Sequence, residues 1–346
     1  MRISSIECGR VLAILAVMTI HVSPFANPFN PALWGSGSWL WLSGTINQLC
    51  RFAVPLFFLC AGYFLQPRLS REAPLTVAWR YCHPLLLLWL VWSLVYLLVP
   101  FNPLDAVQQG YLASLRGQWQ FQLGDPLNGW LVGGMIHLWF LPALIMAVTL
   151  LALCYRLGRP ELALWLGLGL YLLALLGGSY AKPLLGAEWP LLLTRNGLFF
   201  SLLFVALGAL LRQRQWQPYA RTGWQLLLAG VTLYGCEAWT LQHFAAVPLT
   251  RHDFLLGSLP WAIGLFGLLL ANPEWGKGSW LERQAPKVLG IYCLHMMLVI
   301  WLFVFGPQAA SILWEIAKVP LLLGSSLLVY RLLATIPLTR RLLRTH

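Results

Sequence analysis

Two side chains near the start of the chain have types and a spacing that suit chemistry on a polar substrate. Arg10 and His21 lie in the apolar run GRVLAILAVMTIHVSP, where ionisable groups are costly unless they line a site or a pathway. An imidazole, with an ordinary pKa of about 6.5, suits a general base, and a guanidinium group suits phosphate. On a helix, both would project from nearly one face, about 16 Å apart. We therefore interpret His21 as a candidate catalytic base and Arg10 as a candidate phosphate ligand.

Both residues also have purely structural interpretations. Arg10, near one end of a membrane helix, could snorkel to lipid phosphate and pair with Glu7 three residues earlier. His21 could be a hydrogen-bonded core residue. Glu237, near the end of a later apolar run, is a weaker candidate for the catalytic base and could instead pair with an arginine.

Four residues in later apolar runs are further candidates. Arg51 needs a polar partner within the membrane, so it favours substrate binding, with a buried structural ion pair as the alternative. His137 and Trp139 begin a run together, and an aromatic wall with a polar group suits a sugar, although an interfacial histidine costs little. His295 could line a path for a donor substrate or hydrogen-bond to a neighbouring helix.

Two candidates lie near expected loops. Arg195, with Arg251, His252 and Asp253, is expected at the outer surface, where it could bind an anionic substrate or form part of a solvated loop. Arg80, at the inner start of a run, favours a topology anchor, with contact to a donor phosphate as the alternative.

The elements that must position these residues are apolar runs of membrane-spanning length. A span needs about 20 residues, and such runs predict helices at roughly 6–25, 44–66, 79–100, 137–157, 161–178, 196–213, 222–241, 254–272, 288–306 and 310–333. The chain is 59% hydrophobic and 10% charged, against roughly 25% charged in soluble domains. We therefore predict an all-α polytopic membrane protein of about ten helices, formed as a single domain over residues 1–346.

Charge and cysteine content narrow the possible functions. The net charge of +12 favours basic loops facing an anionic membrane leaflet over nucleic-acid binding. The seven cysteines form no C-x-x-C pair, so neither a disulfide framework nor a metal site is expected. The first apolar run is interpreted as a retained span rather than a cleaved signal, because no convincing cleavage site follows it.

Basic residues predict the orientation of the chain. Most of the 23 Lys and Arg residues fall in alternate loops, which by the positive-inside rule are cytoplasmic. Both termini are then cytoplasmic, which fits an even number of spans. The segment 101–136 falls on the opposite side, and its interleaved Gly, Pro, Asn and aromatic residues predict an ordered outer loop.

Five segments follow one another in an order that resembles a known family. They are Arg10 and His21 with ten residues between them, then CRFAVPLFFLCAGYFL (50–65), HLWFL (137–141), LFFSLLFVALGALL (198–211) and LGIYCLHMML (289–298). The arrangement resembles acyltransferase family 3, the multi-pass membrane O-acyltransferases that modify bacterial surface glycans. The segments look most like the stand-alone branch that includes the O-acetyltransferase of enterobacterial common antigen. Ala61 stands where the family usually has Ser, and Glu7 where it usually has Asp.

The resemblance implies an activity, a location and partners. It implies transfer of an acyl group, with acetyl favoured, from cytoplasmic acetyl-CoA to a hydroxyl of a lipid-linked or surface polysaccharide on the outer side of the bacterial inner membrane. Arg10, His295 and Arg80 would then serve the donor, Arg51, His137, Trp139 and Arg195 would serve the acceptor, and no nucleic acid or metal would take part.

A membrane transporter or flippase for a glycan or lipid intermediate is the alternative function. Its intramembrane charges would then line the transport path. Transporters often show two related halves with broken helices, and we find no such symmetry in this sequence. A scaffold subunit is a third possibility, but it would not explain why the chain keeps ionisable side chains within its apolar runs, namely Arg10, His21 and Arg51.

Overall fold

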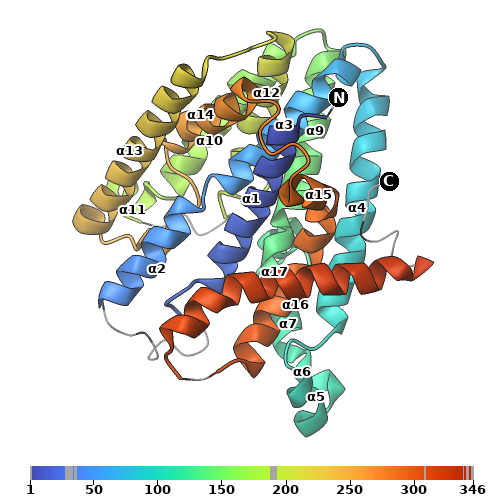
Figure 1. The fold of residues 1–346 in the computed structure, drawn as a ribbon, viewed down its shortest axis with the longest axis vertical. Helices are drawn as coiled ribbons and strands as arrows, with labels where there is room; N and C mark the ends of the chain where they lie inside the picture. Colours follow the sequence, from blue (N-terminus) through green and yellow to red (C-terminus); the bar gives the residue numbers. More distant parts are fainter. Residues whose placement is uncertain are drawn as a thin grey trace. The chain divides into compact units, whose positions relative to one another are not determined.

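The computed structural model describes residues 2–27, 34, 37–187, 193–307, 309–337, 339 and 343 of the chain. Within these residues the fold is helical and contains no β-strand, which confirms the all-α prediction (Figure 1). The longer helices are α1 (Ser4–Val22), α2 (Gly37–Leu49), α3 (Ala53–Leu69), α4 (Pro74–Leu98), α9 (Phe140–Arg156), α10 (Glu161–Gly177), α12 (Leu198–Gln213), α13 (Ala220–Ala245), α14 (Ser258–Ala271), α16 (Val288–Phe305) and α17 (Ile312–Thr335).

Shorter helices fill the connections. They are α5 (Pro103–Gln109), α6 (Tyr111–Ser114), α7 (Arg116–Gly124), α8 (Pro126–Val132), α11 (Ala181–Leu185) and α15 (Trp280–Gln284), with 3₁₀ turns η2 (Ile136–Trp139), η3 (Leu249–Arg251) and η4 (Ala285–Lys287). The segment 101–136, predicted to be an ordered outer loop, consists largely of α5 to α8. Its place on the outer side of the membrane stays a prediction.

Six helical stretches of the described chain are long and apolar enough to cross a bilayer. They are Ser4–Val22, Gly37–Leu69, Pro74–Leu98, Ile136–Arg156, Trp280–Phe305 and Ile312–Thr335, and α10, α12 and α14 are shorter apolar helices. The chain is therefore a multi-pass membrane protein. The count of ten spans and the orientation of the termini stay predictions.

The predicted span 44–66 is interrupted where its polar residues lie. α2 ends at Leu49, and α3 begins at Ala53 after a turn that contains Arg51. Pro55 is tolerated in the first turn of α3 because backbone N–H groups there have no partner within the helix. Arg51 thus lies in a turn between two helices, and not within one continuous helix over 44–66 as the sequence predicted.

The contacts divide the chain into two compact units, each built from three separate segments. The first unit comprises Met1–Ala13, Arg51–Leu86 and Phe140–Ala285, and the second comprises Ile14–Cys50, Leu87–Trp139 and Pro286–His346. Each unit is described by itself below. The expectation of a single domain over residues 1–346 stays a prediction.

In the first unit, α12 packs against α3, α9 and α10. The crossing of α3 and α12 depends on two glycines. A Cβ at Gly62 would lie 1.9 Å from the carbonyl oxygen of Val205, and a Cβ at Gly208 would lie 2.1 Å from that of Leu59. These distances are shorter than any van der Waals contact, so only glycine allows the two backbones to approach this closely.

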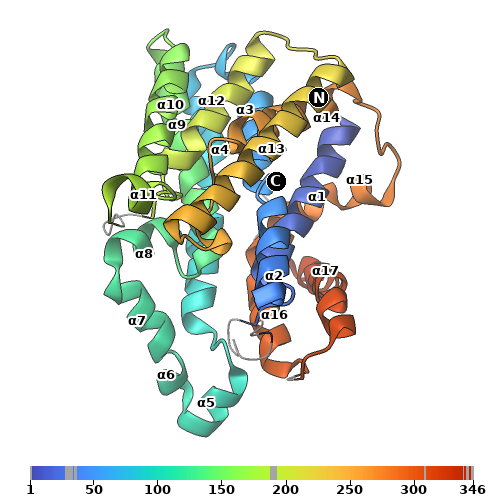
Figure 2. The ribbon, with the colours of Figure 1, turned by 90° about the vertical axis from the view of Figure 1, so that its left-hand side faces the viewer.

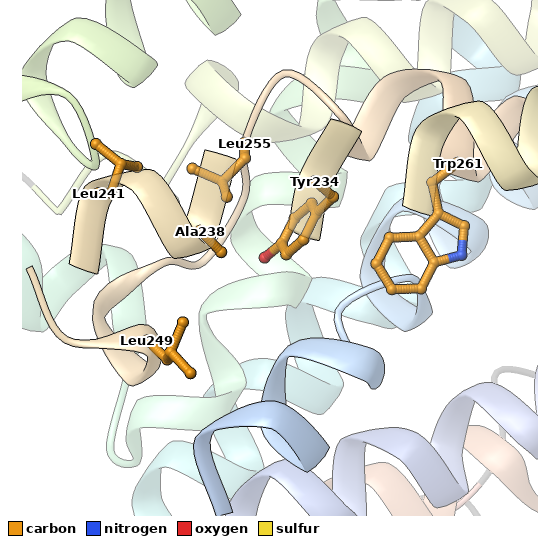
Figure 3. Packing of buried hydrophobic residues seen from close by; sticks show 6 residues of the cluster. All are labelled: Tyr234, Ala238, Leu241, Leu249, Leu255 and Trp261. Atoms are coloured by element: carbon orange, nitrogen blue, oxygen red, sulfur yellow. The ribbon is translucent and has the colours of Figure 1, made fainter. Parts of the chain in front are cut away.

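A second packing centre in the first unit joins α13 to α14 and to the loop before α14. Its buried residues are Tyr234, Ala238, Leu241, Leu249, Leu255 and Trp261 (Figure 3). The rings of Tyr234 and Trp261 meet edge to face with centroids 5.3 Å apart. This packing fixes the loop of residues 249–257, which carries His252 and Asp253.

In the second unit, α5 to α8 form a string of short helices, and α16 packs against α17 (Figure 2). Gln118 of α7 ties this string to α4, because its side-chain amide donates to the carbonyls of Tyr96 at 2.7 Å and Val99 at 2.9 Å.

A buried ion pair on α17 forms hydrogen bonds with the chain segment that follows α1. Glu315 and Lys318 are each 2% exposed, and their charged atoms lie 2.5 Å apart. Glu315 also accepts hydrogen bonds from the backbone N–H of Phe25 at 2.8 Å and from the indole of Trp34 at 3.1 Å. Phe25 has a φ of 62°, a strained value for a residue with a side chain, so Glu315 helps to stabilise that turn.

Candidate active site

Three histidines from separate segments come together in the second unit. His21 lies in the last turn of α1, His137 in η2 and His295 in the third turn of α16. The ring of His295 lies 5.4 Å from that of His21 and 5.1 Å from that of His137, and the rings of His21 and His137 are 6.3 Å apart. Residues that were predicted to serve as base, acceptor ligand and donor ligand therefore share one cluster, which we call the histidine cluster.

Two tyrosines hold the histidine cluster in place. The Tyr96 hydroxyl donates to the carbonyl of Cys293 at 2.8 Å, and the Tyr292 hydroxyl donates to the carbonyl of His137. Their rings lie 5.2 and 5.3 Å from the ring of His137. These contacts join α4, η2 and α16 around His137 within the second unit.

Two imidazole nitrogens in the histidine cluster are buried without a hydrogen-bond partner among the described residues. They are Nδ1 of His137 and Nε2 of His295, and the two residues are 2% and 0% exposed. Leaving a buried polar atom unbonded costs about 1–3 kcal/mol. Native structures rarely keep such a cost without a reason, so both nitrogens mark a place where a ligand group would bind. His137 was expected at a membrane interface, and its burial gives it a stronger reason to contact a ligand.

Arg10 lies on α1 within the first unit. Its guanidinium group pairs with Glu7 at 3.1 Å, and its side chain is 32% exposed. The i,i+3 pairing is the one that the sequence allowed. Arg10 thus keeps an accessible cation at one end of α1, and its role as a phosphate ligand stays a prediction.

Arg51 and Arg195, both in the first unit, share one carboxylate. Their guanidinium groups lie 2.7 Å and 3.0 Å from the oxygens of Asp253. Burial opposes the charged form of Asp253, but Arg195 and Arg51 outweigh it and hold the pKa of Asp253 below its ordinary value. Two positive groups and one negative group leave a net charge of +1. We call Arg51, Arg195 and Asp253 the arginine triad.

His252 lies next to Asp253 in the sequence and is completely buried. Burial disfavours its charged form, and the Arg51 charge adds to this effect, so the pKa of His252 falls to about 4. A neutral His252 adds no charge to the arginine triad near neutral pH. The predicted solvated loop is therefore an ordered, partly buried structure.

Glu237, on α13 of the first unit, is extensively hydrogen-bonded. Its carboxylate accepts from the Tyr180 hydroxyl, from Leu256 N at 3.2 Å and from Gly257 N at 2.8 Å. Burial and the neighbouring carboxylate raise the pKa of Tyr180, which therefore stays a donor to Glu237. These bonds tie the loop before α14 to α13, which is a structural task.

Arg80 and Trp139 are the remaining predicted residues. Arg80 is exposed on α4 and contacts Glu72 at 3.1 Å. Trp139 lies in η2 with His137 and is half-buried. In the part of the chain that the structure describes, no group of three or more His, Cys, Asp or Glu side chains is arranged to hold a metal ion.

Several residues that contribute to these structures were not among the sequence predictions. Tyr96 carried no signal, because an isolated tyrosine in an apolar run looks like any core residue. Tyr292 lies three residues before His295, so the helical spacing could have placed the two together. The same spacing relates Glu315 to Lys318 within an apolar run, which is a recognisable sign of a buried pair.

The comparisons with known proteins bear on this site. A family model described as an acyltransferase domain, that of acyltransferase family 3, matches residues 3–335. The chain belongs to this family. Acyltransferase family 3 proteins that resemble it include a serine/alanine racemase of Enterococcus gallinarum, 28% identical over 85% of this chain and 40% of that protein. Another is an amino-acid racemase of Enterococcus faecalis, 27% identical over 86% of this chain and 41% of that protein.

The chain thus spans about two fifths of the length of these racemase-named relatives. No solved structure matches it. Family membership makes the chain a membrane protein of an acyl-transfer family.

Proposed function

We propose that the protein is an integral-membrane O-acyltransferase that moves an acetyl group from cytoplasmic acetyl-CoA to a sugar hydroxyl. The acceptor would be a lipid-linked or surface polysaccharide on the outer side of the bacterial inner membrane, as in the branch that acts on enterobacterial common antigen. The observation that carries the proposal is the histidine cluster, in which His21, His137 and His295 meet from three segments. Family membership supports the reaction class.

The reaction requires a base. The acceptor oxygen attacks the thioester carbonyl, an O–C ester bond forms, and the C–S bond of acetyl-CoA breaks. His21 would take the hydroxyl proton and pass it to the departing thiolate, so that free coenzyme A leaves as the thiol. Glu237 is the weaker candidate, because its oxygens already accept three hydrogen bonds that hold the loop before α14.

Cationic groups would hold the anionic parts of the substrates. Arg10 is the proposed ligand for a coenzyme A phosphate, with Arg80 as a second contact, since both guanidinium groups are accessible. The arginine triad has a net charge of +1 and would attract an anionic acceptor. The spacing of Arg10 and His21 in the sequence, about 16 Å on an ideal helix, would suit the long, thin pantetheine arm of coenzyme A.

The racemase activity of the relatives is not proposed for this chain. More than half of each relative lies outside the matched region, so the match does not cover the whole protein to which that name applies. A transporter or flippase would not change the mass of a glycan, so the experiment below separates that function from acyl transfer.

The direct test is mass spectrometry of surface glycans from cells with and without the gene. We expect a gene-dependent mass increase of one acyl group. His21→Ala should abolish this increase, because it removes the group proposed to accept the hydroxyl proton, while the variant still inserts into membranes. His243→Ala, which changes an exposed histidine on α13, is the matched control and should keep the modification.

Normal acylation by His21→Ala would refute the base assignment, and no gene-dependent acyl group would refute the proposed function. Arg10→Ala tests the donor side separately. It should weaken acetyl-CoA binding to the purified protein by roughly tenfold, the loss of one charge-assisted contact. Unchanged donor affinity would remove Arg10 from the site.

A further inference from the structure

The partners of His137 and His295 fix which hydrogen each ring carries. Nδ1 of His295 lies 2.7 Å from the carbonyl oxygen of Tyr292, and Nε2 of His137 lies 3.4 Å from that of Cys293. A carbonyl oxygen only accepts, so these ring nitrogens must be the donors. In a neutral imidazole the other nitrogen then carries a lone pair. Nε2 of His295 and Nδ1 of His137, the two buried nitrogens without a partner, are therefore both acceptors.

Two acceptors require a ligand that brings two donor hydrogens. Their rings lie 5.1 Å apart at an angle of 84°, a spacing at which neighbouring groups of one small ring can serve both. No carboxylate in the described part of the chain hydrogen-bonds to either imidazole, so an ammonium group would find no counter-charge there. Tyr96 and Tyr292 flank His137, and such rings suit the apolar faces of a sugar. These features favour neutral hydroxyl groups.

We infer that Nδ1 of His137 and Nε2 of His295 bind a vicinal diol of the acceptor sugar, one hydroxyl each. This inference rests on the proposed function and adds the feature by which the acceptor is recognised. The diol is not the attacked group. It orients the sugar so that a third hydroxyl faces His21, which lies 5.4 Å from His295 between ring centroids. His137 and His295 are thus substrate-binding residues.

Amide substitutions separate this role from a structural one, because asparagine places its amide near the Nδ1 position and glutamine near the Nε2 position. His295→Asn and His137→Gln keep a donor toward Tyr292 and Cys293 but remove the free acceptor. His295→Gln and His137→Asn do the reverse. If the free nitrogens bind substrate, glycan acylation should fall at least tenfold in the first pair and stay within about tenfold of wild type in the second.

Thermal unfolding of the purified variants supplies the second readout. The first pair should unfold near the wild-type temperature, and the second pair should be less stable, so activity and stability change in opposite directions. If acylation instead follows stability in all four variants, the two histidines are structural and the inference is wrong. Because acylation and thermal stability are both compared across four variants, the test stays valid even if one variant fails to fold.

The ligand class is tested on the modified glycan itself. Periodate cleaves vicinal diols, so the acylated sugar should still consume periodate before its ester is removed with mild alkali. An acylated sugar that resists periodate would overturn the inference, and so would an alkali-stable amide, which would indicate an amine acceptor. Periodate resistance of an alkali-labile ester would leave the proposed function intact. An amide would overturn the hydroxyl acceptor of the proposed function as well, and the absence of any gene-dependent acyl group would refute acyl transfer altogether.

Discussion

His252 is a completely buried histidine whose pKa, at about 4, lies well below the ordinary 6.5. The unfolded chain binds a proton as the pH falls through 6.5, whereas the folded protein resists protonation until about pH 4. The folded state is therefore favoured above pH 6.5 and loses about 3 kcal/mol between pH 6.5 and 4. Asp253 acts in the same direction at lower pH, because its lowered pKa stabilises the fold only while the carboxylate stays charged.

His252→Gln should flatten the acid side of the stability profile. Glutamine has a similar size and does not titrate, so unfolding temperatures of the purified protein between pH 6.5 and 4 should depend less on pH. His243→Gln, a change at an exposed histidine, is the control and should leave the wild-type slope in place. An unchanged slope in His252→Gln would show that another group produces it.

At the scale of helices, the crossing of α3 and α12 is set by backbone contact. Gly62→Ala would place a methyl group 1.9 Å from the carbonyl oxygen of Val205, so the helices must separate. We expect a loss of roughly 1–3 kcal/mol or more in the free energy of unfolding. Gly169→Ala on α10 is the control, because no atom lies within 4 Å of its added Cβ.

The control should be neutral or more stable by up to about 1 kcal/mol, since alanine favours a helix more than glycine does. Unfolding of both variants in detergent, followed by circular dichroism, measures the difference. Equal stability of the two variants would mean that the crossing tolerates a wider separation.

The buried ion pair between Glu315 and Lys318 on α17 should contribute strongly to stability. Glu315→Gln leaves Lys318 charged and buried without its partner and weakens the bonds to Phe25 and Trp34. We expect a loss of about 3–5 kcal/mol, the usual cost of breaking a buried ion pair. Because Phe25 follows His21 by four residues, acylation should also fall as the end of α1 loosens.

Glu274→Gln is the matched control for this change. Glu274 and Lys277 form an ion pair with the same i,i+3 spacing and the same distance of 2.5 Å, but both side chains are largely exposed. Its removal should leave stability and acylation unchanged, because water screens exposed pairs. A loss in the control as large as in Glu315→Gln would contradict the role of burial.

At the scale of the whole molecule, three of the apolar helices are short for membrane spans. α14 has 14 residues and so extends only about 21 Å, against a hydrocarbon core of about 30 Å. α10 and α12, with 17 and 16 residues, are also short. Ten spans therefore require local thinning of the bilayer or flanking residues that reach the interface.

Cysteine labelling tests the predicted orientation. In a variant without the seven native cysteines, Gln108→Cys should react with a membrane-impermeant maleimide added to the outer face of the inner membrane. Gln217→Cys, at an exposed position between α12 and α13, should react only after lysis, because the arginines around it predict a cytoplasmic loop. The opposite labelling pattern would show that the chain has the reverse topology and that the predicted donor and acceptor sides are wrong.

The sequence alone determined that the chain is helical and membrane-embedded, since long apolar runs have few alternatives in a membrane. It also singled out His21, His137 and His295, because ionisable groups in such runs need a reason. Only the tertiary structure decided that these three meet and which nitrogens stay free. The burial of His137 and the pairing of Arg51 and Arg195 with one carboxylate were likewise decided there. Such contacts join residues far apart in the chain, and hydropathy, which is a local property, carries no information about which helices pack together.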